Sequence, residues 1–174
     1  MNKEIPQWSW YNTQFLFSFD EALKKNSNLT LNEFFTDFKQ LHKLENISFH
    51  LKNQGTVISA LYSLLVIPRE IWESKEELGT SFRFLTKSEF CIIEGKDIAQ
   101  NTWKFLRLMR NAISHAHFEI FIDKEEYVFW NYNPQDPEKK RNFEASISHQ
   151  GLCEFIAEIG KYYINEVARK QGNQ

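Results

Sequence analysis

The spacing of apolar residues changes near residue 117, and this change constrains the fold more than any other feature of the chain. Before it, apolar residues recur every three or four positions, which is the helical period. After it, two short apolar runs, Phe118–Ile122 and Tyr127–Trp130, are typical of strands joined by a polar turn. Phe143–Ser148 alternates as a third strand does, and helical spacing then returns. We expect a mainly α fold, a four- or five-helix bundle with a small antiparallel β-sheet inserted before the C-terminal helix.

Capping signals and apolar periodicity together indicate the helices before residue 117. Thr30 and Glu33 have the spacing of a capping box, in which each side chain satisfies a backbone N–H group that the first turn leaves free. The expected helices are a short one at Phe15–Lys25, after an irregular first dozen residues, and others at Leu31–Leu44, Asn46–Ile67, Ser74–Leu85 and Asp97–His115, the last with Asp97 as its N-cap. The helix from Leu31 should bury Phe34, Phe38 and Leu41.

Length and composition favour a single compact unit. The chain has 174 residues, of which 42% are hydrophobic, so it has enough apolar material for a core. Within this unit we expect residues 1–45 to form an N-terminal extension that packs on the bundle. Residues 46–170 should form the helical domain itself.

Charge and composition restrict the classes of partner. The net charge of -2 gives no global attraction to nucleic acid, so any polyanion must be held by a local basic patch. The sequence MNKEIPQWSWYNTQF lacks the apolar stretch of a signal peptide, and no apolar run approaches the ~20 residues of a membrane span. We therefore expect a cytoplasmic protein without membrane contact. Cys91 and Cys153 lack the paired spacing of a zinc site, which favours two free buried thiols over one disulfide, and neither a metal nor a cofactor is expected.

The segment from Asp97 to Ala116 separates into two faces when its residues are placed at ~100° per residue. The apolar face gathers Ile98, Phe105, Met109, Ala112, Ile113 and Ala116. The opposite face covers an arc of about 140°, contains no acidic residue, and gathers Lys104, Arg107, Arg110, Asn111, Ser114 and His115. Three cations, an amide, a hydroxyl and an imidazole on one acid-free face suit a phosphate group.

These side chains match what RNA cleavage requires. The reaction needs a base for the 2′-hydroxyl, an acid for the leaving 5′-oxygen and positive charge beside the phosphorus. Histidine titrates near neutrality without help, and arginine grips phosphate with a planar fork of donors. Asn111 precedes His115 by four residues, so it can orient the imidazole or a phosphate oxygen. His115 also lies at the expected helix end, where the helix dipole favours imidazolium.

The pattern Arg110-Asn111-x-x-x-His115 resembles the R-x(4–6)-H motif of HEPN domains, including the polar residue that follows the arginine. This resemblance implies a helical bundle and the activity of a metal-independent ribonuclease, as found in bacterial toxin–antitoxin, phage-defence and RNA-processing systems. It also implies a homodimer that brings two motifs into one cleft. By this resemblance Arg110, Asn111 and His115 are catalytic.

The surrounding sequence resembles one plasmid- and chromosome-encoded bacterial HEPN subfamily. The similar stretches are LRLMRNAISH at residues 106–115, the FE that follows, a hairpin containing FWN, and EASI before the last helix. They cover roughly Asn46–Ala168. Within this interpretation Lys104, Arg107 and Ser114 contact the RNA, and an antitoxin or neighbouring regulatory protein is a further possible partner.

Alternatives remain open at this point. His117 satisfies the loosest spacing from Arg110 as well, although His115 is preferred because His117 falls near the apolar edge and beyond the expected helix. In one alternative, Arg110 and His115 have no catalytic role and serve as cations at a helix C-terminus, where they complement the helix dipole. The domain could also be non-catalytic and bind nucleotide, RNA or a protein partner. The basic run Lys139–Arg141 is interpreted as a solvated loop rather than an RNA contact.

Overall fold

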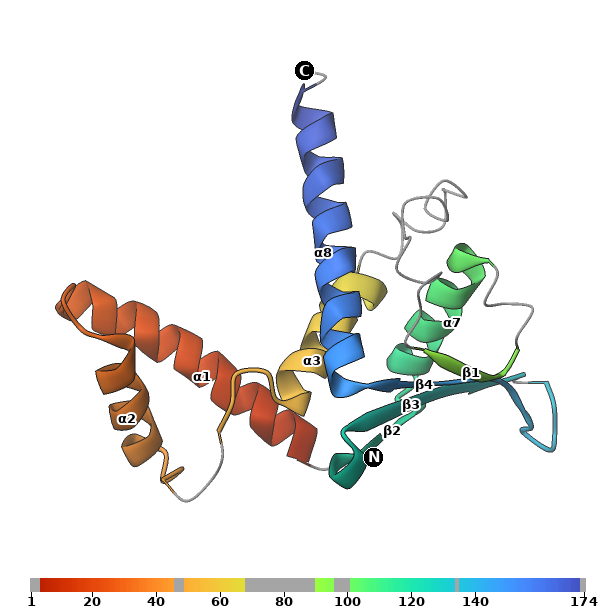
Figure 1. Ribbon diagram of the computed structural model, residues 1–174, viewed down its shortest axis with the longest axis horizontal. Helices are drawn as coiled ribbons and strands as arrows, with labels where there is room; N and C mark the ends of the chain where they lie inside the picture. Colours follow the sequence, from red (N-terminus) through yellow and green to blue (C-terminus); the bar gives the residue numbers. More distant parts are fainter. Residues whose placement is uncertain (1–3, 46–48, 68–89, 96–100, 134, 173–174) are drawn as a thin grey trace. The chain divides into compact units, whose positions relative to one another are not determined.

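A computed structural model describes residues 4–45, 49–67, 90–95, 101–133 and 135–172 (Figure 1). The chain divides into two compact units, Lys3–Ser59 and Ala60–Gln174, and each is described by itself. The helix expected at Ser74–Leu85 lies outside the described residues. The described part is mainly helical and contains a small antiparallel sheet, as expected, but the sheet has four strands rather than the three expected. None of the described helices is both long and apolar enough to cross a bilayer.

The first helix, α1, runs from Glu4 to Lys25, so the expectation of an irregular first dozen residues is wrong. Its inward residues continue one helical stripe, because Trp8, Tyr11 and Phe15 follow each other at spacings of three and four. Trp8 and Tyr11 pack against the buried cluster of this unit. Pro6 lies in the first turn, where its missing N–H group has no helical partner to lose.

The second helix, α2, spans Leu31–Leu41 and ends before the expected Leu44. The Thr30–Glu33 capping box is confirmed. After the helix Lys43 adopts a φ of 55°, and the Leu44 N–H group donates to the carbonyl of Lys39 at 2.7 Å, which closes the helix end. Phe34 and Phe38 are buried as expected. Leu41 is wrongly expected in the core, because it is 73% exposed and Leu44 is buried instead.

Helix α3 spans Gln54–Leu61, so it begins well after the expected Asn46. Its start is set by Asn53, whose side-chain oxygen accepts the Thr56 N–H group at 3.2 Å as an N-cap. Asn12 of α1 also donates to this oxygen at 3.0 Å, which ties the cap to α1. A π-helical turn, η1, continues α3 over Tyr62–Val66.

The sheet has the strand order β1-β4-β3-β2, and every neighbouring pair is antiparallel. The three strands expected from the sequence are β2 at Phe118–Phe121, β3 at Glu126–Tyr132 and β4 at Arg141–Ser148. The strand β1 at Cys91–Glu94 was not expected, since a four-residue run carries little periodicity and is defined by its pairing with β4. Neither cysteine forms a disulfide, and the expectation that both thiols are buried is wrong, because Cys91 is exposed and Cys153 is half-buried.

Helix α7, Thr102–Ser114, lies across one face of the sheet (Figure 1). The C-terminal helix α8 follows β4 and spans His149–Gly172. Between these elements the rings of Phe90, Phe105 and Phe155 form an edge-to-face cluster, with centroids 5.0 to 6.3 Å apart. In β3 the side chains that face α7 alternate with outer ones, and Tyr127, Phe129 and Asn131 are buried.

Both ends of α7 are capped locally. The side-chain oxygen of Asn101 accepts the Lys104 N–H group at 3.0 Å, so Asn101 is the N-cap of α7, and the cap expected at Asp97 lies outside the described residues. At the other end His115 is the C-cap and Ala116 takes a left-handed φ of 53°. The His117 N–H group then donates to the Ala112 carbonyl at 2.7 Å. This reversal turns the chain directly into β2.

We predict that Ala116→Gly stabilises the protein by about 1 kcal/mol, because glycine has no Cβ to strain the left-handed conformation. The matched control is Ala157→Gly at an exposed position inside α8, which should destabilise by about 0.5–1 kcal/mol. Thermal or denaturant unfolding of both variants measures the two effects. A loss of stability in Ala116→Gly would contradict the described helix end.

Candidate functional site

The two faces of α7 are arranged as its periodicity predicts. The residues that face the sheet and neighbouring helices are at most 4% exposed: Phe105, Leu106, Met109, Ala112 and Ile113. Ala116, expected on the same face, is exposed because it lies beyond the helix in the left-handed reversal. The buried face therefore fixes which side chains α7 presents outward.

The outward face of α7 carries every residue that the sequence analysis selected. Arg110 and Asn111 are half-buried, and one Nη2 hydrogen of Arg110 is donated to the Asn111 side-chain oxygen at 3.1 Å. The remaining members are exposed to solvent: Lys104, Arg107, Ser114 and His115. The bond between neighbouring side chains holds a cation and an amide together at the edge of a pocket.

This pocket has a volume of about 440 Å³ and lies between α7 and the end of the β3–β4 hairpin. Asn111 and His115 line it together with Leu108, because positions three and four apart share a helix face. The other lining residues are His117, Asn131, Tyr132, Asn133 and Asn142. Lys104, Arg107, Arg110 and Ser114 are not among the lining residues, although Arg110 is hydrogen-bonded to the lining residue Asn111.

His115 and His117, the two histidines that the sequence left as alternatives, both line this pocket. The ring centroids of His115 and His117 are 5.6 Å apart, with 30° between the ring planes. The His117 ring also packs against Tyr132, at 4.8 Å between centroids, and is stacked with Trp130 at 6.2 Å. Its Nδ1 atom is buried and has no hydrogen-bond partner among the described residues. The structure therefore places both imidazoles in one pocket, so its geometry is compatible with either as the functional histidine.

The environment of His117 favours its neutral form. Burial lowers the pKa of His117 below its ordinary value, because a charged imidazolium loses hydration there. The charge of His115 lowers it further, and a hydrogen bond with Asn131 opposes both effects in part. A neutral imidazole can accept a proton near pH 7, while the neighbouring His115 is exposed to solvent.

The asparagines and the tyrosine of the hairpin were missed by the sequence analysis. Asn131 occupies an inward position of β3 and is only 7% exposed, and its Nδ2 atom donates to the Leu108 carbonyl of α7 at 2.7 Å. The available signal in the sequence was an amide at a position where the strand pattern expects a buried side chain. A buried amide needs a hydrogen-bond partner, so such a position indicates a specific contact. Asn142 carries no such signal, because only the hairpin register brings it to α7.

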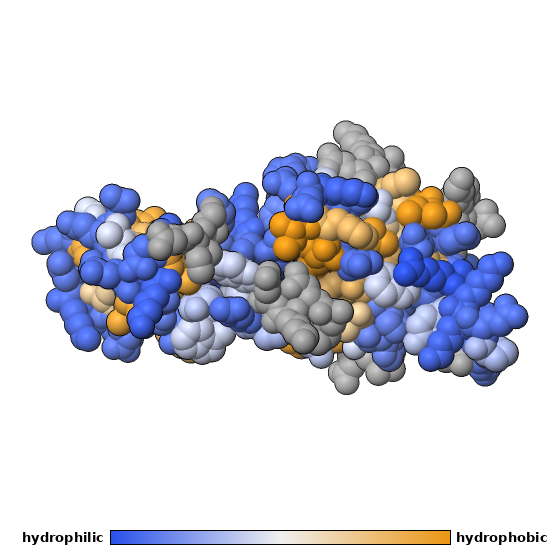
Figure 2. Space-filling view, turned by 90° about the horizontal axis from the view of Figure 1, so that it is seen from below, coloured by the Kyte–Doolittle hydropathy of each residue, from blue (hydrophilic) through white to orange (hydrophobic). Residues whose placement is uncertain are grey.

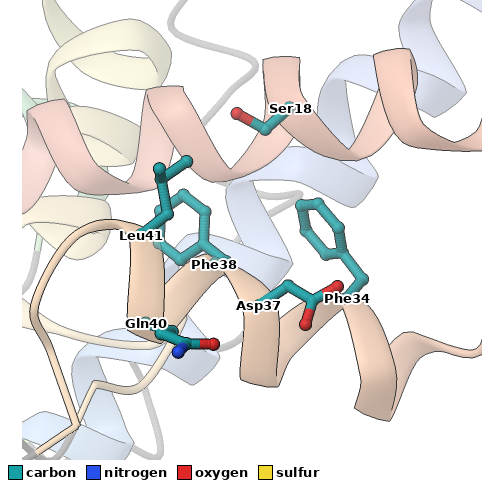
Figure 3. A pocket seen from close by; sticks show the side chains of 6 residues that line it. All are labelled: Ser18, Phe34, Asp37, Phe38, Gln40 and Leu41. Atoms are coloured by element: carbon teal, nitrogen blue, oxygen red, sulfur yellow. The ribbon is translucent and has the colours of Figure 1, made fainter.

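A second pocket lies within the Lys3–Ser59 unit, between α1 and α2 (Figure 3). It has a volume of about 460 Å³ and is lined by Ser18, Phe34, Asp37, Phe38, Gln40 and Leu41. Its one charged lining residue is the acid Asp37, and no histidine or cation lines it. This lining offers no cation to a phosphate group, whereas the α7 pocket has two histidines in its lining and Arg110 hydrogen-bonded to its lining residue Asn111.

Comparison with known proteins gives one match. A family model described as HEPN pEK499 p136 matches residues 1–170, which is nearly the whole chain. The match includes the 45 N-terminal residues that lay outside the resemblance drawn from the sequence. No curated protein and no solved structure matches the chain.

We predict that His117 titrates below its ordinary pKa of 6.5 and that His115→Gln raises the pKa of His117. The replacement removes the positive charge of a protonated neighbour, but the effect of burial remains. NMR titration of the His117 Cε1–H signal measures its pKa in the wild type and in His115→Gln. His50→Gln, outside the pocket, is the control and should leave the His117 titration unchanged. A His117 midpoint at or above 6.5, or one insensitive to His115→Gln, would contradict the described site.

Proposed function

Since the chain belongs to the HEPN pEK499 p136 family, we propose that it is a metal-independent endoribonuclease with its site at the end of α7. One observation carries the proposal. The acid-free outer face of α7 places Arg110 beside Asn111, and both Asn111 and His115 border a pocket that no carboxylate lines. Such a site attracts a phosphodiester and supplies groups that move protons.

The proposed reaction is attack of the RNA 2′-oxygen on the adjacent phosphorus. A neutral imidazole takes the 2′-hydroxyl proton, and His117 is proposed for this step because burial, which lowers its pKa, keeps it in the neutral form. The new bond gives a 2′,3′-cyclic phosphate as the 5′-oxygen leaves, and His115 donates a proton to that oxygen. Arg110 stabilises the negative charge that builds on the phosphorane, and Asn111 orients the guanidinium.

The exposed residues of α7 extend the site along the RNA. Lys104 and Arg107 are exposed on the same helix face as Arg110, so they are proposed to hold phosphates of the backbone. Ser114 is exposed next to His115 and is proposed as a hydrogen-bonding RNA contact. These contacts give affinity without sequence preference.

We further propose that the protein acts as a homodimer in the cytoplasm, with its helices in a four- or five-helix bundle. Figure 2 shows exposed apolar residues among hydrophilic ones. In the Ala60–Gln174 unit η1 and α8 contact each other, and they expose Tyr62, Ile67 and Ile164 at 48%, 69% and 70%. Large exposed apolar side chains favour a protein interface. A toxin or phage-defence role, with an antitoxin or regulatory partner, is consistent with this proposal.

We predict that the protein cleaves RNA in the presence of EDTA and that His115→Ala and Arg110→Ala lower kcat by about 10²–10⁴-fold. The control is His50→Ala, an exposed histidine outside the pocket, which should retain the wild-type rate. Gel analysis of a labelled transcript measures the rates. Equal cleavage by all four proteins would contradict the proposed site.

A non-catalytic module is the other outcome of this experiment. It predicts RNA binding that survives His115→Ala, together with no scission by the wild type under any condition. Binding measured in parallel on the same transcript therefore separates loss of chemistry from loss of affinity.

Mixing variants tests whether both protomers contribute to one site. In a composite cleft, a mixed dimer of Arg110→Ala and His115→Ala protomers still contains one arginine and one histidine that can cooperate. We predict that the mixture, after exchange of subunits, cleaves RNA faster than either variant alone. A rate equal to the mean of the two variants would contradict a composite site.

A further inference from the structure

The wall of the α7 pocket that faces Asn111 and His115 is built by the β3–β4 hairpin. It presents Asn131, Asn133 and Asn142 together with the ring of Tyr132. None of these side chains is needed to bind or cleave a phosphodiester. Amides and an aromatic ring are the groups that proteins use to bind the bases of RNA.

Hydrogen bonds within the hairpin determine which amide atoms remain available. Asn131 donates to Leu108 of α7 at 2.7 Å, so it positions the hairpin against the helix. The side-chain oxygen of Asn133 accepts the Gln135 N–H group at 3.1 Å, which leaves its NH₂ group as a donor. The Asn142 side chain is exposed, and no hydrogen bond engages its amide within the described residues. Asn142 therefore offers both a donor and an acceptor to a ligand.

Aromatic rings and cations flank these amides. The Lys139 ammonium lies 5.9 Å from the Tyr132 ring centroid. The Arg141 guanidinium lies 4.3 Å from the Trp130 ring centroid and is paired with Glu144 at 2.6 Å. The run Lys139–Arg141 is therefore partly engaged with aromatic residues rather than only solvated. A base that enters the pocket meets the Tyr132 ring, which already contacts His117, and the Lys139 ammonium lies beside that ring.

The size of the pocket limits the ligand. A volume of about 440 Å³ is in the range of small-molecule sites and far too small for a duplex. In paired RNA the Watson–Crick edges of the bases are hydrogen-bonded to each other. The major-groove edges lie in a deep, narrow groove that side chains do not enter. The volume accommodates an unpaired nucleotide, whose base can meet the amides and the ring.

We propose that the hairpin wall receives an unpaired base of the RNA next to the scissile phosphate, and that Asn142 and Asn133 read its edge. This inference rests on the proposed ribonuclease function and adds its substrate class, which is single-stranded RNA with a base preference beside the cut. Asn131 is a positioning residue, since it acts through the Leu108 carbonyl.

The test is cleavage of single-stranded oligonucleotides with each base in turn beside the cut, by wild type and by Asn142→Leu. We expect the wild type to prefer one base, and Asn142→Leu to lower kcat/KM for that base by about 10- to 100-fold. An abasic nucleotide at the same position should be cut equally by both proteins. The control is Asn165→Leu, at an exposed position of α8, which should keep the preference.

The inference is overturned if Asn142→Leu keeps the wild-type preference, or if duplex RNA is cut as fast as single-stranded RNA. A second measurement does not depend on cleavage. The four nucleoside 5′-monophosphates are titrated into the wild-type protein, and the side-chain amide signals of Asn133 and Asn142 are followed by NMR. Shifts at these amides without RNA scission support the base pocket and refute the proposed chemistry. Scission without amide shifts or base preference refutes the base pocket alone.

Discussion

The left-handed conformation of Ala116 is the constraint on which the site depends. It stops α7 after His115 and sends the His117 N–H group back to the Ala112 carbonyl at 2.7 Å. One residue thereby separates His115, at the end of α7, from His117, directly before β2, and their ring centroids lie 5.6 Å apart. A longer α7 would point the two imidazoles in different directions, since positions two apart on a helix differ by ~200°.

The second constraint is the bond between Asn131 and the Leu108 carbonyl, which fixes the hairpin against α7. It brings the hairpin amides opposite the helix face that carries Asn111 and His115. The pocket therefore has two walls of different chemistry. The helix wall presents Asn111 and His115, with the Arg110 guanidinium hydrogen-bonded to Asn111, and the hairpin wall presents amides and an aromatic ring. This division suits a polymer substrate in which a charged backbone alternates with neutral bases.

The sequence predicts α7 and its faces well because both are local: buried residues at helical spacing and an acid-free outer face follow from the order of residues alone. The strands β2, β3 and β4 were predicted for the same reason. The start of α1 was missed because Pro6 and closely spaced aromatic residues obscured the three- and four-residue spacing of its inward side chains. The strand β1 was missed because four residues become a strand only by pairing with β4. The hairpin wall could not be predicted, since it depends on strand register and on α7 packing. Arg110, Asn111 and His115 were found by motif, and their chemical roles remain predictions.

The most direct test of the central claim is the chemical identity of the RNA ends that the protein produces in EDTA. Attack by the 2′-oxygen, assisted by histidines at the end of α7, predicts a 2′,3′-cyclic phosphate on one fragment and a 5′-hydroxyl on the other. Mass spectrometry of the fragments distinguishes these ends from those made by an attacking water molecule. Fragments with cyclic phosphates from the wild type, lost in His115→Ala, are the predicted result. Fragments with 5′-phosphate and 3′-hydroxyl ends, or cyclic phosphates formed equally by His115→Ala, would contradict the account.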